Sequence, residues 1–100
     1  MAKKKKDVQQ LAQTLRIMGD ETRLRVLLTV QDKECNVTEL CKKLKMPQPS
    51  VSRHLGILRM GGLVNNRREG KHIHYSLADL SELSHGEAVQ EMLASVGSPN

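Results

Sequence analysis

The chain has 100 residues, of which 38% are hydrophobic, and its formal net charge is +5. This size suits one small domain in which burial alone is marginal, so pairing with a second copy is expected to help stability. Residues 3–6 are all lysine and no apolar run approaches the ~20 residues that cross a bilayer, so we expect neither a membrane span nor a signal peptide. We expect a cytoplasmic protein whose two cysteines are reduced thiols.

The positive charge is concentrated in the middle of the chain. Residues 42–71 hold eight Lys or Arg and one Glu, a net charge of +7, whereas residues 72–100 hold four acidic residues and no Lys or Arg. Basic side chains that neutralise phosphates release condensed counterions, so this distribution is typical of a phosphate-binding surface. A solvated basic face without a ligand is the alternative interpretation.

The predicted elements begin with a helix. Residues 1–6 have nothing to bury, so we expect a disordered basic tail ahead of one domain that spans residues 7–96. The first helix is predicted to start at Asp7, which can cap it, and to stop at Gly19. Its apolar stripe consists of Val8, Leu11, Leu15 and Met18.

Two further helices are predicted before residue 45. Asp20 can cap the first of them, in which Arg23 and Arg25 point away from the buried stripe Leu24, Leu27 and Leu28. Residues 31–36 are polar and should form a loop, with a short strand around Cys35. The next helix covers residues 37–44, and its buried positions follow helical spacing: Val37, Leu40, Cys41 and Leu44.

The stretch from Gln48 to Met60 is predicted to be a fourth helix. Pro47 stops the helix before it, and Pro49 is tolerated in its first turn. Its outward surface is polar and positive, because the apolar positions repeat at helical spacing: Val51, Leu55 and Leu58. Two short helices across a tight connection are the outline of a helix-turn-helix.

A basic hairpin is predicted next. Residues 63–68 and 72–77 flank a turn at residues 69–71, and apolar residues alternate with polar ones along the second strand, so one face should point inward. A basic hairpin directly after a helix-turn-helix makes a winged helix. The predicted fold class is therefore mainly α (α+β winged helix), with five or six helices and a two- or three-stranded β-wing.

The last predicted helix covers residues 79–96, and Gly86 either kinks it or splits it. A terminal helix this apolar in so short a chain needs a partner surface, and a two-fold pair of winged helices would present two recognition helices to successive major grooves. We therefore expect a homodimer, with folding back onto the same domain as the alternative. The expected interface residues are Val8, Leu11, Leu15, Val89, Met92, Leu93 and Val96.

Five motifs occur in a recognisable order: G-D-E-T-R-L-R at residues 19–25, V-T-E-L at 37–40, Q-P-S-V-S-R-H-L at 48–55, L-R-M-G-G-L-V at 58–64 and G-K-H-I-H-Y at 70–75. Together they resemble the ArsR/SmtB family of bacterial winged helix-turn-helix repressors over roughly residues 8–96. The resemblance implies a homodimer that blocks transcription from an operator. In many members a metal or another signal releases it.

By position, the resemblance implies that five side chains face the major groove: Gln48, Ser50, Ser52, Arg53 and His54. Arg and Gln can pair bidentately with guanine and adenine edges, and Ser hydroxyls bind bases or phosphates. Arg53 is the first choice for a base contact, while Gln48 and Ser50 near the helix N-terminus are alternatives for phosphate. An exposed or capping role is the alternative for Ser52 and His54. The wing is expected to contact phosphate or a minor groove through Arg67, Arg68 and Lys71.

The sequence does not define what signal the protein senses. The family's thiol motif E-L-C-V-C-D-L-C aligns with residues 34–41, where only Cys41 matches and Cys35 is displaced by one position. A thiophilic metal needs two to four converging thiolates, which these two residues do not supply within one chain. Cys41 is most simply a small core residue. A thiol redox switch through both cysteines stays open, with Lys42 and Lys43 favouring a thiolate.

The family's other metal site uses an Asp-x-His pair and a His-x-x-Glu pair in the terminal helix. Asp79 matches its first ligand, but the other positions hold Ser81, Met92 and Ser95. His72 and His74 share a strand face without a third ligand, so exposed histidines near phosphate are the preferred interpretation. We predict neither a metal nor a cofactor.

The predicted function is a sequence-specific dimeric DNA-binding transcriptional regulator with a double-stranded DNA operator as its partner. Its recognition helix covers about residues 48–60 and its wing about residues 63–77. An enzyme is not predicted, because there is no Gly-rich phosphate loop and no nucleophile beside a base. Two alternatives stay open: a winged-helix module for protein or RNA interaction, and a repressor that acts as a thiol redox or atypical metal sensor. The small-molecule or metal inducer is not defined.

Overall fold

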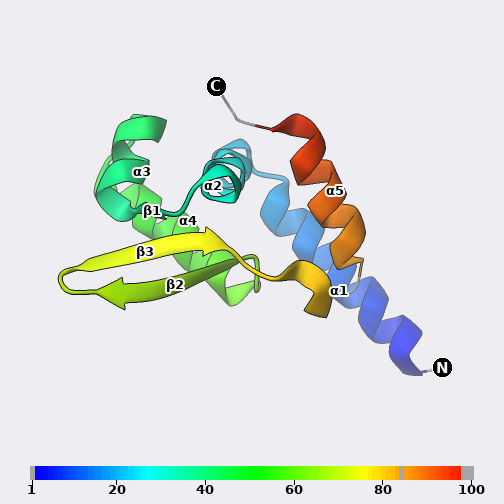
Figure 1. Cartoon of the computed structure of the whole chain (residues 1–100). Helices are drawn as coiled ribbons and strands as arrows, with labels where there is room; N and C mark the ends of the chain where they lie inside the picture. Colours follow the sequence, from blue (N-terminus) through cyan, green and yellow to red (C-terminus); the bar gives the residue numbers. More distant parts are fainter. Residues whose placement is uncertain (1, 84, 98–100) are drawn as a thin grey trace.

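The structure is a computed structural model that describes the backbone of residues 2–83 and 85–97 and the side chains of residues 8–81, 83 and 85–97. Figure 1 shows its elements in chain order: α1 (Ala2–Met18), α2 (Glu21–Asp32), β1 (Cys35–Asn36), α3 (Val37–Leu44), α4 (Gln48–Met60), β2 (Val64–Glu69), β3 (His72–Leu77), the 3-10 helix η1 (Leu80–Glu82) and α5 (Gly86–Val96). Within these residues, five α-helices and a three-stranded sheet confirm the predicted mainly helical, winged-helix class.

Helix α1 starts earlier than the sequence analysis predicts. The expected disordered tail differs from the structure, because α1 begins at Ala2 and includes residues 2–6; Met1 lies outside the described residues. Lysine has a high helix propensity, so the basic run extends the helix and Asp7 is not its N-cap. The predicted end is confirmed, since the Gly19 N–H donates to the Leu15 carbonyl at 2.8 Å.

Helices α2 and α3 begin at side-chain caps. The Asp20 carboxylate accepts a hydrogen bond from the Arg23 N–H at 3.0 Å, which confirms the predicted cap of α2. Asn36 and Glu39 form a capping box at α3, in which each side chain accepts the other residue's backbone N–H at 2.8 Å. This reciprocal pair explains why α3 starts at the predicted residue, Val37.

The sheet has the strand order β1-β3-β2 and is antiparallel throughout. Strands β2 and β3 form the predicted hairpin, in which Glu69 pairs with His72 and the turn between them has Gly70 at φ 61°. The short strand β1 pairs with the other edge of β3, through Cys35 and Tyr75. The hairpin tip projects beyond the helices (Figure 1), where the wing of a winged helix lies.

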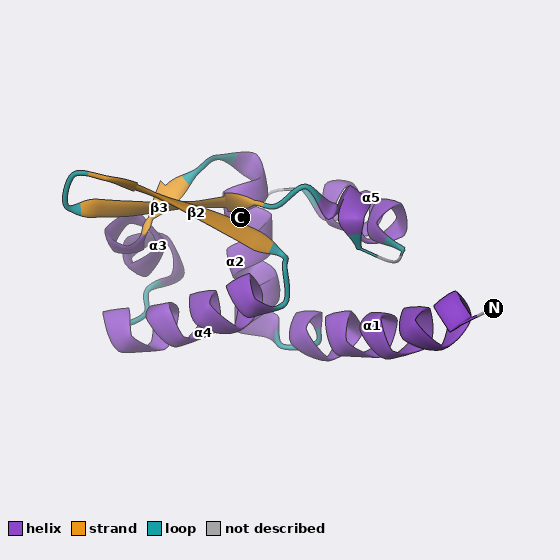
Figure 2. Cartoon of the chain, turned by 90° about the horizontal axis from the view of Figure 1, so that it is seen from below, coloured by secondary structure: helices purple, strands orange, loops and turns teal. Residues whose placement is uncertain are grey.

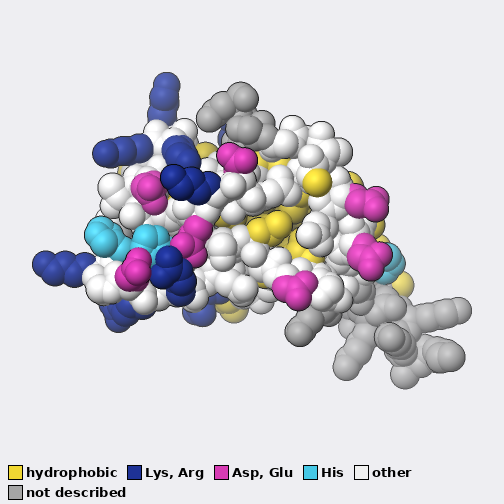
Figure 3. Space-filling model, in the orientation of Figure 1, with side chains coloured by type: hydrophobic (Ala, Val, Ile, Leu, Met, Phe, Trp, Pro, Cys, Tyr) yellow, Lys and Arg dark blue, Asp and Glu magenta, His cyan; other side chains and the backbone are white. Residues whose placement is uncertain are grey.

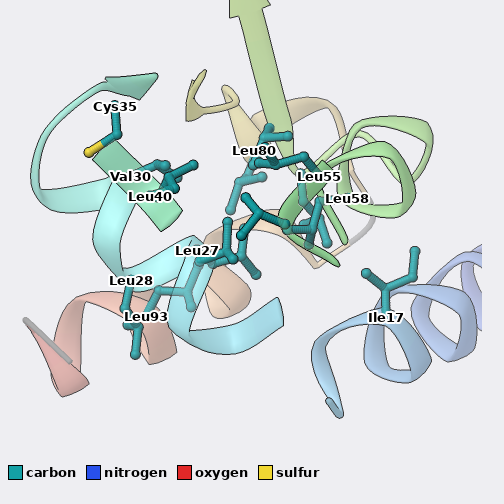
Figure 4. Close-up of a cluster of buried hydrophobic side chains, with 14 of the residues drawn as sticks. Ile17, Leu27, Leu28, Val30, Cys35, Leu40, Leu55, Leu58, Leu80 and Leu93 are labelled. Atoms are coloured by element: carbon teal, nitrogen blue, oxygen red, sulfur yellow. The ribbon is translucent and has the colours of Figure 1, made fainter. Parts of the chain in front are cut away.

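Helix α2 runs through the centre of the core, and every residue from Val26 to Val30 is buried. Figure 4 shows leucines from several elements turned toward one another around it. Burying a leucine contributes about 1.5–3 kcal/mol relative to leaving it exposed, so this cluster dominates the stability of a core without Trp or Phe. The buried apolar residues are Ile17, Val26, Leu27, Leu28, Val30, Cys35, Leu40, Val51, Leu55, Leu58, Leu63, Val64, Leu80, Val89 and Leu93.

Gly86 divides the predicted terminal helix into η1 and α5. A Cβ at this position would collide with the backbone carbonyl of Leu80, so only glycine permits the close approach of the two segments. The face of α5 that carries Val89 and Leu93 is buried in the chain's own core. This corrects the expectation that these two residues lie at a dimer interface. No helix in the described part of the chain is long and apolar enough to cross a membrane.

Replacing Gly86 by alanine is expected to lower the free energy of unfolding by ~1–3 kcal/mol, because the new methyl group meets backbone that cannot move aside. Gly56→Ala is the matched control. An alanine Cβ there has no atom within 4 Å, and loss of a mid-helix glycine should stabilise the protein by ~0.5–1 kcal/mol. Urea unfolding of the two variants measures both values, and equal effects would contradict the steric account.

Candidate nucleic-acid interface

The apolar stripe of α4 determines which of its side chains reach solvent. Val51, Leu55 and Leu58 are at most 1% exposed and pack into the core. Gln48, Ser52 and Arg53 are therefore on the exposed face, as predicted, while Ser50 is half-buried. An exposed helix face with guanidinium, amide and hydroxyl groups can form hydrogen bonds to base edges and to phosphate oxygens.

The N-terminus of α4 has no acidic cap, although its Ser50 and Val51 N–H groups are hydrogen-bonded and its two prolines carry no N–H. Pro47 occupies the N-cap and makes no side-chain cap hydrogen bond, and the first turn contains no acidic residue. The N–H groups of Ser50 and Val51 donate to the Pro47 carbonyl at 3.1 and 3.2 Å. The positive end of a helix dipole without a carboxylate cap is a favourable position for a phosphate group.

His54 does not lie where the sequence analysis placed it. Its side chain is only 8% exposed, and its Nδ1 lies 3.4 Å from Nη1 of Arg23, on α2. Position 54 is three residues after Val51 and four before Leu58, which places it on the buried stripe. The prediction that His54 faces the major groove is therefore wrong.

Arg67 in the wing is held by an acidic partner. Its Nη2 and Nε donate to the two carboxylate oxygens of Glu34 at 2.7 and 3.0 Å, and its Nη1 lies 3.6 Å from Glu69. The hydrogen bonds from Arg67 hold the pKa of Glu34 below its ordinary value, and those to Glu34 raise the pKa of Arg67. Arg67 thus fastens β2 to the loop before β1, whereas Arg68 and Lys71 are exposed near the hairpin tip.

Charge is distributed unevenly over the surface. Figure 3 shows Lys and Arg side chains concentrated at the end of the molecule that holds α3 and the hairpin, where several acidic side chains lie among them, while the α5 end shows acidic side chains and no Lys or Arg among the described residues. Lys42, Lys43 and Lys45 are exposed on and after α3, close in sequence to the N-terminus of α4. A polyanion would be attracted to this end and repelled by the other.

The two cysteines differ in their surroundings. Cys35 is fully buried; its Sγ lies 3.2 Å from the Lys33 carbonyl, to which it donates, and 3.7 Å from Nζ of Lys43. Burial raises the pKa of the Cys35 thiol even though Lys43 acts in the opposite direction. The effect expected of Lys43 is therefore present at Cys35, but burial outweighs it. Cys41 is half-buried against the core, in agreement with the core role predicted for it.

The histidines do not assemble a metal site. The rings of His72 and His74 have their centroids 6.3 Å apart, and Nε2 of His74 lies 3.4 Å from a Glu69 oxygen. Among the described side chains, those of residues 8–81, 83 and 85–97, no three His, Cys, Asp or Glu come together as ligands. Asp79 caps η1 instead, and hydrogen bonds from Ser81 hold its pKa low.

An apolar groove lies between α1, α2 and α5. Its volume is about 300 Å³, and four large hydrophobic residues of α1 and α5 are 48–68% exposed: Val8, Leu15, Met92 and Val96. Leu11 of the predicted interface is half-buried. The residues that line the groove are Leu15, Met18, Gly19, Leu24, Met92, Leu93 and Val96. Apolar area of this kind on so small a chain indicates a surface that another molecule covers.

Helices α3 and α4 with the hairpin that follows them define a winged helix-turn-helix domain. Residues 20–66 match the bacterial regulatory protein, arsR family. The chain is 41% identical over 86 residues to the HTH-type transcriptional regulator CmtR of Mycobacterium tuberculosis, a match that covers 84% of this chain and 72% of that relative. The chain belongs to the ArsR family of bacterial regulatory proteins.

Other relatives are matched over a shorter part of their length. The arsenical resistance operon repressor of Escherichia coli is 43% identical over 67 residues, which are 66% of this chain and 57% of the repressor. The chain thus spans little more than half of that relative. The solved structure of reduced HlyU from Vibrio cholerae covers 96% of this chain and 97% of its own, with 31% identity and a TM-score of 0.79.

A second similar structure is that of a homodimeric DNA-binding domain. The homodimeric winged helix-turn-helix DNA-binding domain of Mb0332 from Mycobacterium bovis, a possible ArsR-family transcriptional regulator, has 29% identity and a TM-score of 0.73. The match covers 89% of this chain and 76% of that one. Both structures agree with this chain in the arrangement of the helices and the wing.

The different burial of the two cysteines predicts their reactivity. At neutral pH Cys35 is expected to react with iodoacetamide at least about tenfold more slowly than Cys41, because a buried thiol with a raised pKa forms little thiolate. Mass spectrometry of the peptides after timed alkylation measures both rates. Unfolding in urea is the control and should remove the difference; equal rates in the folded protein would contradict the burial of Cys35.

Proposed function

We propose that this protein is a sequence-specific, dimeric DNA-binding transcriptional regulator, a repressor of ArsR/SmtB type, that binds a double-stranded DNA operator in the cytoplasm. The observation that carries the proposal is the exposed polar face of α4, formed by Gln48, Ser52 and Arg53. Figure 2 shows α4 at the same end of the molecule as α3 and the hairpin. Membership of the ArsR family supports the same function. Nothing in this arrangement requires a catalytic activity.

We assign the DNA contacts of the individual side chains from their solvent exposure. Arg53 and Gln48 read base edges in the major groove, and Ser52 contributes a hydroxyl to a base or a phosphate. Ser50 lies in the first turn of α4 and supports a phosphate at the helix N-terminus. Arg68 and Lys71 at the hairpin tip bind the backbone or enter a minor groove.

Two of the residues that the sequence predicts to contact DNA, His54 and Arg67, have other roles in this proposal. His54 is buried beside Arg23, so it contacts no base. Arg67 keeps its bidentate pair with Glu34 and positions the wing, and its contribution to phosphate binding is smaller than that of Arg68 or Lys71.

The proposed homodimer uses the apolar groove between α1 and α5. The contacts are assigned to Val8, Leu11, Leu15, Met92 and Val96, since Val89 and Leu93 are buried within the chain. A two-fold axis at this end places the two α4 helices away from the axis, where they can enter successive major grooves about 34 Å apart. The acidic end of α5 then stays away from the DNA.

A titration against the protein's own promoter region tests the class of function. A fluorescent duplex from that region should bind at physiological salt, and an excess of unrelated duplex should compete poorly. Repetition with zinc, arsenite, copper and an oxidant identifies the signal, if one releases the DNA. A single-stranded RNA that outcompetes the duplex would favour the RNA-binding alternative and contradict the regulator.

Substitutions in α4 and in the wing should have different effects on DNA binding. Arg53→Ala is expected to cost ~1–3 kcal/mol on the cognate site and to relax its sequence preference, since a base contact is lost. Lys71→Ala should weaken all sequences about equally and reduce the salt dependence, since a phosphate contact is lost. Gel-shift titrations on cognate and scrambled duplexes measure both, and cognate binding unaffected by Arg53→Ala would remove Arg53 from the reading set.

The dimer surface is tested by adding one charge. Met92→Lys is expected to convert the dimer to a monomer, because a lysine ammonium would be buried in an apolar interface. Ala94→Lys adds the same charge to the exposed acidic side of α5, beside Glu87 and Glu91, and is the matched control. Analytical ultracentrifugation reports the mass of each variant. A Met92→Lys protein that remains dimeric would place the interface elsewhere.

A further inference from the structure

Arg23 lies where α1, α2 and α4 meet. Its Nε donates a hydrogen bond to the Ile17 carbonyl in the last turn of α1 at 2.8 Å, and its backbone N–H donates to Asp20 at the start of α2. Its Nη1 lies 3.4 Å from Nδ1 of His54 in α4. The partly buried guanidinium of Arg23, a residue of α2, therefore contacts both α1 and α4.

Arg23 can only be the donor in this contact. A guanidinium is permanently charged and only donates hydrogen bonds, so the contact is a hydrogen bond when Nδ1 of His54 accepts it. A protonated imidazole would place a donor and a second positive charge against Arg23. Arg23 on α2 and the carboxylate of Asp20 at the N-cap of α2 are charged groups near His54.

An apolar contact also joins the end of α1 to the end of α4. Ile17 is buried, and a Cβ added at Gly61, directly after α4, would lie 2.5 Å from its Cδ1. The last turn of α1 thus meets the C-terminal end of α4, and through Arg23 it is connected to the middle of α4. Figure 2 shows α1 and α4 end to end along one side of the molecule.

The last turns of α1 also form one wall of the apolar groove. Leu15, Met18 and Gly19 line the groove and flank Ile17, whose carbonyl holds Arg23. In the proposed homodimer, the partner that covers the groove therefore contacts the segment to which Arg23 is bonded. At the other end of the connection, His54 directly follows Arg53, the residue assigned to base reading.

We propose that Arg23 and His54 are positioning residues that couple the packing of α1 at the groove to the orientation of α4 on DNA. The inference rests on the proposed DNA-binding function and specifies how it is regulated. His54 contacts no base; it holds the α4 turn that carries Ser52 and Arg53 against α2. Loss of the Arg23 to His54 contact leaves the phosphate contacts in place and removes the orientation that sequence reading requires.

The test measures specific and non-specific binding separately. In Arg23→Ala and His54→Ala, affinity for the promoter duplex should fall about tenfold, while affinity for an unrelated duplex of equal length and the slope against salt stay within about twofold. Arg25→Ala is the matched control, because it removes an equal charge from α2 at an exposed residue that pairs with Glu21. It should bind both duplexes like the wild type.

A conservative variant separates positioning from simple packing. His54→Asn retains an acceptor close to the position of Nδ1 and cannot be protonated, so it should recover most of the specific affinity that His54→Ala loses. A His54→Asn protein that is folded but binds as weakly as His54→Ala overturns the inference.

Circular dichroism and thermal unfolding establish that each variant is folded. If Arg23→Ala does not fold, Arg23→Lys replaces it, since one ammonium retains the charge but cannot reproduce the planar fork that bonds Ile17 and His54 together. Specific binding by folded Arg23 variants at the wild-type level overturns the coupling and leaves the proposed function intact. A wild-type protein that does not prefer its promoter duplex overturns both.

Discussion

The packing of one helix face determines the rest of this structure. Val51, Leu55 and Leu58 fasten α4 to the core around α2, and this fixes the exposed face that carries Gln48, Ser52 and Arg53. A rotation of α4 by one residue would bury charge and expose leucine, which costs several kcal/mol. The rigidity of the reading face is therefore a consequence of hydrophobic burial on its opposite side.

The distribution of charge and the attachment of the wing to the rest of the domain complete the proposed DNA-binding interface. Residues 42–71, which include the end of α3, all of α4 and the first strand of the hairpin, have a net charge of +7, whereas residues 72–100 contain no Lys or Arg, so the charge favours an approach of a polyanion to the end that holds α3 and the hairpin. Arg67 and Glu34 link the hairpin to the loop before β1. Although an exposed ion pair contributes little stability, its bidentate geometry fixes the direction of the wing.

Much of this arrangement follows from the sequence, because its signals are local. The bounds of α3 and α4 match the predictions, since the prolines at 47 and 49 constrain the backbone directly. The burial of His54 can also be predicted from the sequence, because its spacing from Val51 and Leu58 places it on the buried stripe. Its polar side chain instead favours the prediction of a solvent-exposed position. The pairing of Arg67 with Glu34 cannot be predicted from local sequence signals, because the fold of the sheet brings together two residues that are 33 positions apart.

The ends of the chain were the least predictable part. Amphipathic spacing in α5 identifies an apolar face, but it does not show that Val89 and Leu93 fill the core while Met92 and Val96 remain exposed. That division depends on Gly86, whose missing side chain lets α5 approach Leu80.

Amide chemical-shift mapping by NMR, with a promoter duplex added to the labelled protein, tests directly whether α4 and the hairpin tip contact DNA. We expect the largest changes in the first turns of α4, around Ser52 and Arg53, and at the hairpin tip near Lys71, with little change along the acidic side of α5. Changes concentrated on α1 and α5, with α4 unaffected, would contradict it.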